Sequence, residues 1–216
     1  KTLLLAWVLL PCCAYAQVMP PSYVERFDST SAPILPPGWS TTTNRLSSGD
    51  FVTTTSSARS SPNAVLSTNA TISQSLTSPP LDFSGGTPIR LEFYVSRSSS
   101  HTAGLVVEAS VDNGKTFPTT VTDTLRNPGT SGYVLFSTSL PASFANQRNV
   151  RFRWRLIPAP SGGTTGTFRL DDVAITTIPS FDLELTRLQA IPNGGGSSFL
   201  PGQTITLGAT VRNSGT

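Results

Sequence analysis

The segment Thr-Phe-Arg-Leu-Asp-Asp-Val-Ala-Ile, residues 167–175, decides the fold of this chain. It alternates apolar and polar residues, as a half-buried β-strand does. Asp171 and Asp172 interrupt the alternation between Leu170 and Val173. Since successive side chains of a strand face opposite ways, we expect one carboxylate to face the packed side of a sheet. A buried carboxylate needs an arginine, several backbone N–H groups or a metal ion as its partner.

The rest of the chain repeats this pattern of short alternating segments, and no stretch shows the 3.6-residue period of a helix. Turns rich in glycine and proline separate the segments at intervals typical of a β-sandwich. We therefore predict an all-β fold in which residues 167–176 form the closing strand of the sandwich. The other predicted strands are 23–28, one or two within 41–55, 64–66, 71–76, 89–95, 104–111, 119–125, 133–140 and 149–157.

Composition supports the same class. The 216 residues include 18 prolines and 17 glycines, and 12% are charged, with a net charge of +3. Many short strands joined by turns have this composition. No basic cluster of the kind that nucleic-acid-binding proteins use is present, so we expect no nucleic-acid partner.

The first sixteen residues have the three parts of a secretory signal peptide in order. Lys1 is followed by an apolar run over residues 2–10 and by the cleavage motif Ala-Tyr-Ala at 14–16. The apolar run is too short to span a bilayer. We predict cleavage near Ala16, a linker at 17–22, and a secreted or cell-surface protein with no transmembrane segment in its mature part.

Both cysteines, Cys12 and Cys13, lie within this signal peptide. The mature chain therefore has no disulfide, although secreted domains of this size often have them. A bacterial source fits better than a eukaryotic one.

A new alternation begins after Ser180, at residues 181–188, and continues after a Gly/Ser-rich loop in a second strand at 201–216. An immunoglobulin-like sandwich needs about 100 residues. Residues 180–216 are too few, so we expect the N-terminal part of a truncated domain whose strands are poorly supported.

Two resemblances rest on short motifs. The run Asp-Leu-x-Leu-Thr-x-Leu from 182, with Pro-Gly-Gln-Thr-Ile-Thr-Leu from 201, resembles the start of a CARDB domain, a bacterial adhesion-related immunoglobulin-like module. Residues 23–179 resemble the bacterial jelly-roll modules called cleaved adhesin or choice-of-anchor J domains, relatives of the MAM domain. The matching pieces are Phe27-Asp28, Leu35 to Trp39, Leu81 to Ser84, Val107 to Phe117 and Leu170 to Val173.

The second resemblance implies a jelly-roll sandwich and a structural calcium ion. In such modules an acidic residue near the first strand and one in the last strand often help to bind the ion, which corresponds to Asp28 and to Asp171 or Asp172. Calcium takes about six to eight oxygen ligands. The alternative is that these carboxylates pair with Arg26, Arg169 or backbone amides.

The alternating arginines Arg151, Arg153 and Arg155 are a second candidate site, for an anionic glycan or carboxylate. The alternative is a solvated face paired with cross-strand acids such as Glu92 or Glu108. Trp39, Tyr94 and Tyr133 could offer stacking faces for sugars, although we expect Trp39, beside Pro-Pro-Gly, to lie in the core.

Catalytic motifs are not found. Residues 110–117 match the Asp-box pattern Ser-x-Asp-x-Gly-x-Thr-aromatic, which we interpret as a structural hairpin in which Asp112 caps the turn and Gly114 takes positive φ. The one histidine, His101, lies in a Ser-rich segment and is expected in an exposed loop. No Gly-x-Ser-x-Gly nucleophile elbow accompanies it, and one histidine without cysteines makes a zinc site hard to build.

The sequence thus predicts a non-catalytic extracellular adhesion or binding module of a larger, bacterial, multidomain protein, with a glycan or protein surface as its ligand. One alternative is an accessory domain of an exported hydrolase whose catalytic domain lies outside this chain. Another is a stalk segment without a ligand. All three use the same fold, and fold alone does not specify function.

Overall fold

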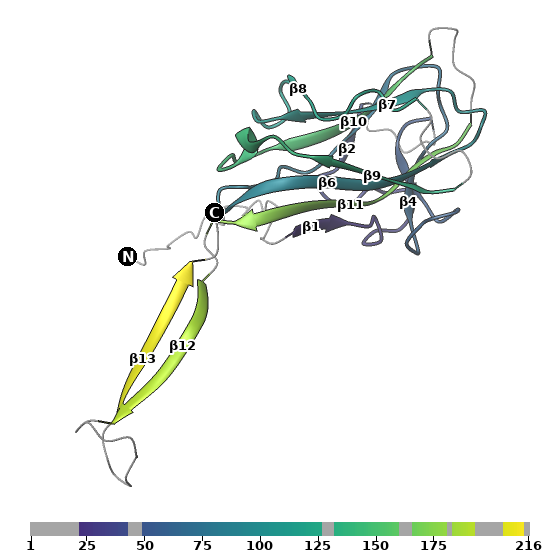
Figure 1. Cartoon of the computed structure of the whole chain (residues 1–216). Coiled ribbons are helices and arrows are strands. Elements are labelled where there is room, and N and C mark those ends of the chain that lie inside the picture. Colours follow the sequence, from purple (N-terminus) through teal and green to yellow (C-terminus); the bar gives the residue numbers. More distant parts are fainter. Residues whose placement is uncertain are drawn as a thin grey trace, which may run out of the picture.

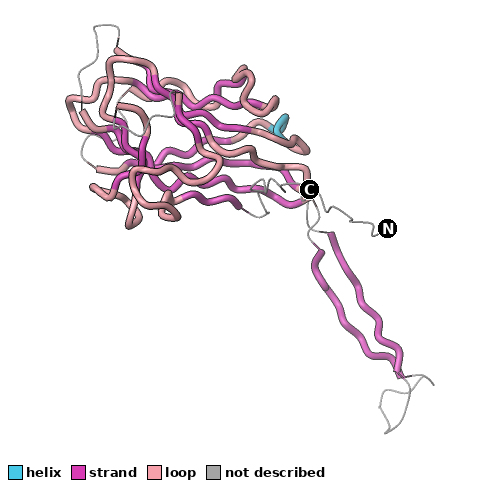
Figure 2. The backbone as a smooth tube through the Cα atoms, turned by 180° about the vertical axis from the view of Figure 1, so that it is seen from behind, coloured by secondary structure: helices cyan, strands magenta, loops and turns pink. Residues whose placement is uncertain are grey.

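Two antiparallel sheets pack face to face and form a β-sandwich (Figure 1). The structure is a computed structural model and describes residues 22–42, 49–126, 132–159, 166–180, 183–192 and 205–213. The predicted signal peptide, most of the linker and most of the Gly/Ser-rich loop lie outside these residues. Within them strands dominate, and the one helical element is the short turn η1 (Ala142–Phe144), cyan in Figure 2. The all-β prediction is confirmed.

The first sheet has the order β3-β4-β11-β6-β9, and β1 pairs with β11 beside this path. The second sheet has the order β2-β5-β10-β7-β8. The strands of the first sheet are β1 (Ser22–Glu25), β3 (Val52–Thr54), β4 (Ala64–Ser67), β6 (Gly86–Arg97), β9 (Val134–Ser139) and β11 (Phe168–Pro179). Those of the second are β2 (Ser40–Thr41), β5 (Gln74–Thr77), β7 (Gly104–Ser110), β8 (Thr119–Thr120) and β10 (Arg151–Ile157).

Strand β11 is the last strand of the sandwich in sequence but the central one in its sheet. It pairs with β6 along one edge, and with β4 and then β1 along the other. This arrangement makes the first and last strands of the sandwich neighbours. It thereby brings the start of the chain close to the aspartate pair of β11.

Alternation places the core as the sequence predicts. The inward-facing residues Leu91, Phe93 and Val95 of β6 and every second residue of β10 are fully buried, whereas all seven residues of β7 are buried. The predicted strand 104–111 extends one residue too far. Strand β7 ends at Ser110, and Val111 is 46% exposed because the chain has already entered a turn.

Aromatic residues close one region of this core. The rings of Phe27 and Trp39 are 5.0 Å apart, and Trp39 lies 5.6 Å from Trp154 of β10. Trp39 is 7% exposed, so its predicted core position is confirmed. It is therefore covered by neighbouring rings and offers no stacking face.

The remaining strands, β12 (Leu183–Pro192) and β13 (Ile205–Asn213), pair only with each other (Figure 1). A register shift between Leu185 and Arg187 lets Leu188 share a face with Leu185. Leu183, Leu185, Leu188, Leu207 and Val211 are each more than half exposed. Within the described residues no other sheet covers these two strands, and the truncated domain stays a prediction.

Candidate functional site

The aspartate pair lies at a β-bulge in β11. The register against β6 shifts between Asp171 and Ala174, and Asp172 has φ +49°. Leu170 and Val173 both belong to the core although they are three residues apart. The extra residue of a bulge allows this, because it changes which way the following side chains point. Both carboxylates contact the segment between β3 and β4, and Asp171 is fully buried there, so the expectation of one buried carboxylate is confirmed.

Asp171 is fully buried and surrounded by N–H groups. Its carboxylate accepts the backbone N–H of Arg59 at 2.8 Å, of Ser60 at 3.1 Å and of Asp172 at 2.8 Å. Burial, and then the neighbouring charge of Asp172, raise its pKa to about 6, although the N–H donors act in the opposite direction. A strand residue that is far away in sequence thus fixes the backbone of the segment around Ser60.

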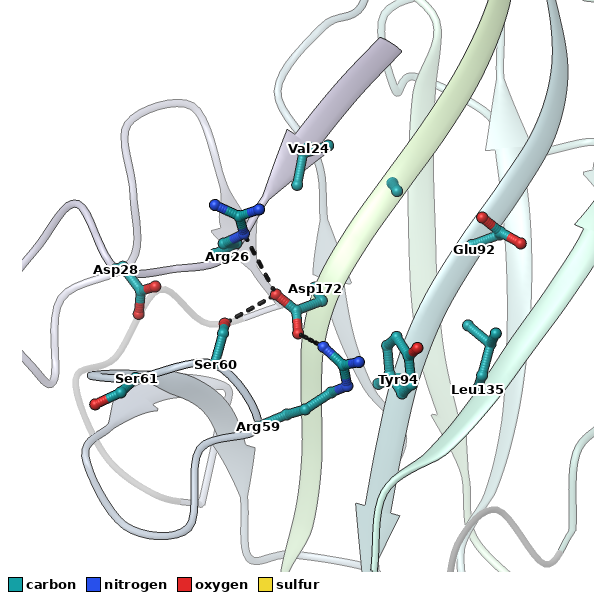
Figure 3. A pocket seen from close by; sticks show the side chains of 11 residues that line it. Val24, Arg26, Asp28, Arg59, Ser60, Ser61, Glu92, Tyr94, Leu135 and Asp172 are labelled. Carbon is teal, nitrogen blue, oxygen red and sulfur yellow. Dashed lines mark hydrogen bonds and ion pairs between the residues drawn. The ribbon is translucent and has the colours of Figure 1, made fainter.

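Asp172 is neutralised by arginine. Its carboxylate accepts from Nη1 of Arg59 at 2.5 Å and from the Ser60 hydroxyl at 2.8 Å, and Nε of Arg26 lies 3.8 Å away (Figure 3). The hydrogen bond to Asp172 raises the pKa of Arg59. The Arg59 guanidinium also lies 3.5 Å from the centre of the Tyr94 ring, a cation–π contact. The aspartate pair therefore has both kinds of partner that were expected as alternatives to calcium, namely arginine side chains and backbone N–H groups.

Beside the cluster lies an open pocket of about 540 Å³ on the outer face of the first sheet (Figure 3). Its lining combines charged groups with exposed apolar side chains, among them Val24 and Leu135, which are 50% and 46% exposed. Its charged residues are Arg26, Asp28, Arg59, Glu92 and Asp172. Since two cations face three carboxylates, the pocket suits a ligand rich in hydroxyl or amide groups better than a polyanion.

Asp28 and Asp172 both line this pocket, as the calcium prediction requires. Asp28, however, accepts the backbone N–H of Asn63 at 2.8 Å, and a cation at Asp172 has to compete with Arg59. The described residues contain no group of three or more His, Cys, Asp or Glu side chains arranged to hold a metal ion. Calcium binding by Asp28, Asp171 and Asp172 stays a prediction.

The arginine stripe of β10 is paired within the protein. Arg153 and Arg155 both bind Glu108 of β7, with N–O distances of 2.8 and 2.5 Å. The hydrogen bond from Arg155 is the largest cause of the lowered pKa of Glu108. Arg151 donates to Oδ1 of Asn113 at 2.9 Å and to the carbonyl oxygen of Ser78 at 2.7 Å. Of the two acids predicted to pair with these arginines, only Glu108 contacts them. The binding of a ligand by Arg151, Arg153 and Arg155 stays a prediction.

The Asp box forms the predicted hairpin. Asp112 accepts the backbone N–H and the hydroxyl of Thr116, at 3.0 and 2.6 Å, and the hydroxyl of Ser110 at 2.6 Å. These hydrogen bonds lower the pKa of Asp112. Gly114 has φ +85°, as the turn requires. All of these contacts are local, so the motif acts on structure here.

His101 is not exposed, contrary to our expectation. Its side chain is fully buried 5.6 Å from the Phe168 ring, and Nη1 of Arg97 donates to its carbonyl oxygen. Burial and the positive charge of Arg97 lower the pKa of the imidazole to about 4. The sequence signal that could have indicated this is the apolar Ala103 just beyond it, which is also buried.

Arg59 and Ser60 are the site residues that sequence reasoning missed. They lie in a Ser-rich segment without periodicity, so no pattern marks them. Of the predicted partners, Arg26 and backbone amides are found. Arg169 instead donates to the carbonyl oxygen of Ser56 and to the Thr167 hydroxyl. The Tyr133 hydroxyl donates to the carbonyl oxygen of Ser57 at 2.9 Å.

No protein-family model matches this sequence. No curated protein matches it either. Among the described residues, no helix has the length and apolar character needed to cross a membrane.

Solved structures show the same fold. One is the K1 cleaved adhesin domain of Lys-gingipain (Kgp) from Porphyromonas gingivalis W83, at 18% identity and a TM-score of 0.53, over 72% of this chain and 97% of that one. Another is the K2 cleaved adhesin domain of Lys-gingipain, at 16% identity and a TM-score of 0.50, over 72% and 97%. The sandwich formed by β1 to β11 therefore has the jelly-roll fold of cleaved adhesin domains.

Proposed function

We propose that this chain is a non-catalytic, extracellular adhesion or binding module, and that its ligand is a glycan or protein surface. The open pocket beside Asp172 is the observation that carries this proposal. It combines two guanidinium groups, carboxylates and exposed apolar side chains on one outer sheet face. Binding sites of this kind orient a ligand through a few polar groups set among apolar surface. The similarity to cleaved adhesin domains supports it at the level of fold.

Export to the cell surface is part of the proposal, through cleavage of the predicted signal peptide near Ala16. The module works within a larger protein, and the CARDB-like strands β12 and β13 continue it toward a second domain. An accessory role in an exported hydrolase uses the same pocket. In that role the catalytic groups lie outside these residues.

Arg26 is the residue on which to test the pocket, because its side chain is 66% exposed and its removal costs the fold little. The purified chain is applied to a glycan array and to an array of extracellular-matrix proteins. We expect Arg26→Ala to weaken binding to the retained ligand about tenfold or more. Arg148→Ala is the matched control, since Arg148 is 72% exposed and does not line the pocket.

A chain that binds neither array contradicts the proposal and favours the stalk interpretation. Equal losses in Arg26→Ala and Arg148→Ala place the ligand elsewhere and count against this pocket. Binding to one array assigns the ligand class.

A further inference from the structure

A second pocket lies between the edges of the two sheets, away from the Asp172 cluster. Its volume is about 460 Å³. One wall comes from the first sheet, through Phe93 of β6 and residues 136–138 of β9. The opposite wall is formed by Thr120 of β8, and by residues 121–123 and Leu125, which follow β8 along the edge of β7. The pocket thus opens at the side of the sandwich, next to the outer edge of β9.

The floor of this pocket is apolar, whereas its walls also carry the polar residues Thr120, Thr122, Asp123, Ser137 and Thr138. Phe93 is fully buried beneath Phe136, and the two rings stack with centres 5.9 Å apart and planes at 19°. Val121, Leu125 and Phe136 pack against the core but are only partly buried. An inserted apolar side chain covers these groups, and the removal of their apolar surface from water favours binding.

Strand β9 offers a free backbone edge beside the pocket. In the described part of the chain it pairs with β6 alone. The N–H of Leu140 donates to the carbonyl of Ile89, which fixes the phase of the antiparallel ladder. Because such ladders alternate, the backbone groups of Leu135, Ser137 and Ser139 face away from β6. No lysine or proline occurs in Val134–Ser139 to block a further strand.

The rim of the pocket carries one charge. Asp123 is the sole charged side chain among the lining residues, and it is exposed. A ligand that carries a positive charge near its apolar anchor complements it. The pocket therefore has an apolar floor, a backbone edge on one side and a carboxylate at its mouth.

We propose that β9 receives an extended peptide of a partner protein as an additional strand of the first sheet. The peptide backbone pairs with Leu135, Ser137 and Ser139. One apolar side chain enters the pocket against Phe136, and a lysine or arginine reaches Asp123. Strand addition of this kind obtains affinity from main-chain hydrogen bonds and specificity from side-chain pockets. This site meets the pocket beside Asp172 at Leu135 of β9, and the two pockets have no lining residue in common.

The test uses the full chain and a pool of fluorescein-labelled seven-residue peptides that alternate threonine with an apolar residue and carry one lysine. Fluorescence anisotropy identifies the members that bind. We expect peptides with a large apolar residue to bind with Kd of roughly 10–100 μM. N-methylation of the peptide at alternate residues removes the N–H groups that face β9, and it should weaken binding about tenfold or more.

Ser137→Pro removes an outward N–H and keeps the backbone ladder to β6, because proline is tolerated on an edge strand, but it also removes the hydrogen bond from the Ser137 hydroxyl to Glu92. We expect it to weaken peptide binding about tenfold or more, whereas the matched Ser137→Thr keeps it. Asp123→Asn should weaken the binding of the peptide that carries lysine. It should leave the binding of the same peptide with threonine in place of lysine unchanged. Arg26→Ala should leave peptide binding intact, which separates this site from the proposed function.

Failure of the whole pool to bind overturns the proposal, as does binding that survives N-methylation. If Ser137→Pro fails to fold, as its melting curve will show, the N-methylated peptides still decide. Gel filtration tests a second copy of this chain as the occupant. If the chain is a dimer, and if Ser137→Thr keeps the dimer while Ser137→Pro loses it, the edge of β9 binds another copy and the peptide proposal is overturned.

Discussion

At the scale of single residues, the adjacent carboxylates of Asp171 and Asp172 bind the segment around Arg59 and Ser60 to the central strand. Two like charges this close repel each other, and the raised pKa of Asp171 reflects this together with burial. Arg59 offsets the charge of Asp172, and backbone N–H groups solvate Asp171. Each partner depends on the other, because removing one leaves a buried polar group without its hydrogen bonds.

Asp171→Ala leaves the backbone N–H groups of Arg59, Ser60 and Asp172 without their acceptor. We expect the free energy of unfolding to fall by about 2–4 kcal/mol, because buried donors lose their partner. Urea denaturation monitored by tryptophan fluorescence measures it. Asp123→Ala is the matched control, since that exposed carboxylate should change stability by less than about 0.5 kcal/mol. Equal effects of the two substitutions contradict the role assigned to Asp171.

His101 should make the protein less stable in acid. Its pKa is about 4 in the folded state against 6.5 ordinarily, so the folded state binds fewer protons. Stability therefore falls as pH drops from about 6.5 toward 4, by a total of about 2–3 kcal/mol. Comparing urea denaturation of the natural chain and His101→Leu across this range isolates the effect. If the difference between the two curves is independent of pH, His101 does not titrate in this way.

At the scale of elements, the Asp-box hairpin depends on Gly114. Its φ of +85° is one that other residues adopt with strain, and an added Cβ lies 2.9 Å from Cδ of Arg151. We expect Gly114→Ala to destabilise the protein by about 1 kcal/mol or more, because alanine does not fit a positive φ. Thermal melting tests this, with Lys115→Ala in the same turn as control. An unchanged melting temperature in Gly114→Ala would mean that the turn relaxes without cost.

The sequence predicted most strands because period-two alternation marks a sheet with one buried face, as in β6 and β10. It also identified Asp171 and Asp172 as unusual. It could not predict that both would turn the same way, because a bulge depends on neighbouring strands. The contact of Arg59 with Asp172 could not be predicted for a related reason, because only the fold brings these two residues together. His101 was misplaced because a Ser-rich segment normally indicates solvent.

At the scale of the whole molecule, a calcium ion bound by Asp28, Asp171 and Asp172 would link the segment after β1 to β11, the last strand of the sandwich in sequence. The resemblance to cleaved adhesin modules predicts that calcium raises the melting temperature relative to EDTA, because a ligand that binds only the folded state stabilises it. Differential scanning fluorimetry of the natural chain measures the shift. Asp28→Asn should abolish it, and Asp82→Asn, outside the pocket, should retain it. Coincident melting curves in calcium and EDTA would show the prediction to be wrong.

The position of β11 also has a consequence for how the chain acquires its structure. The central strand is synthesised after all ten strands that surround it in the sandwich, and it pairs with β1, the first of them. The first sheet therefore lacks its middle until residues 168–179 have emerged from the ribosome. Contacts between such distant segments form slowly. The first sheet of a nascent chain therefore stays incomplete for most of its synthesis.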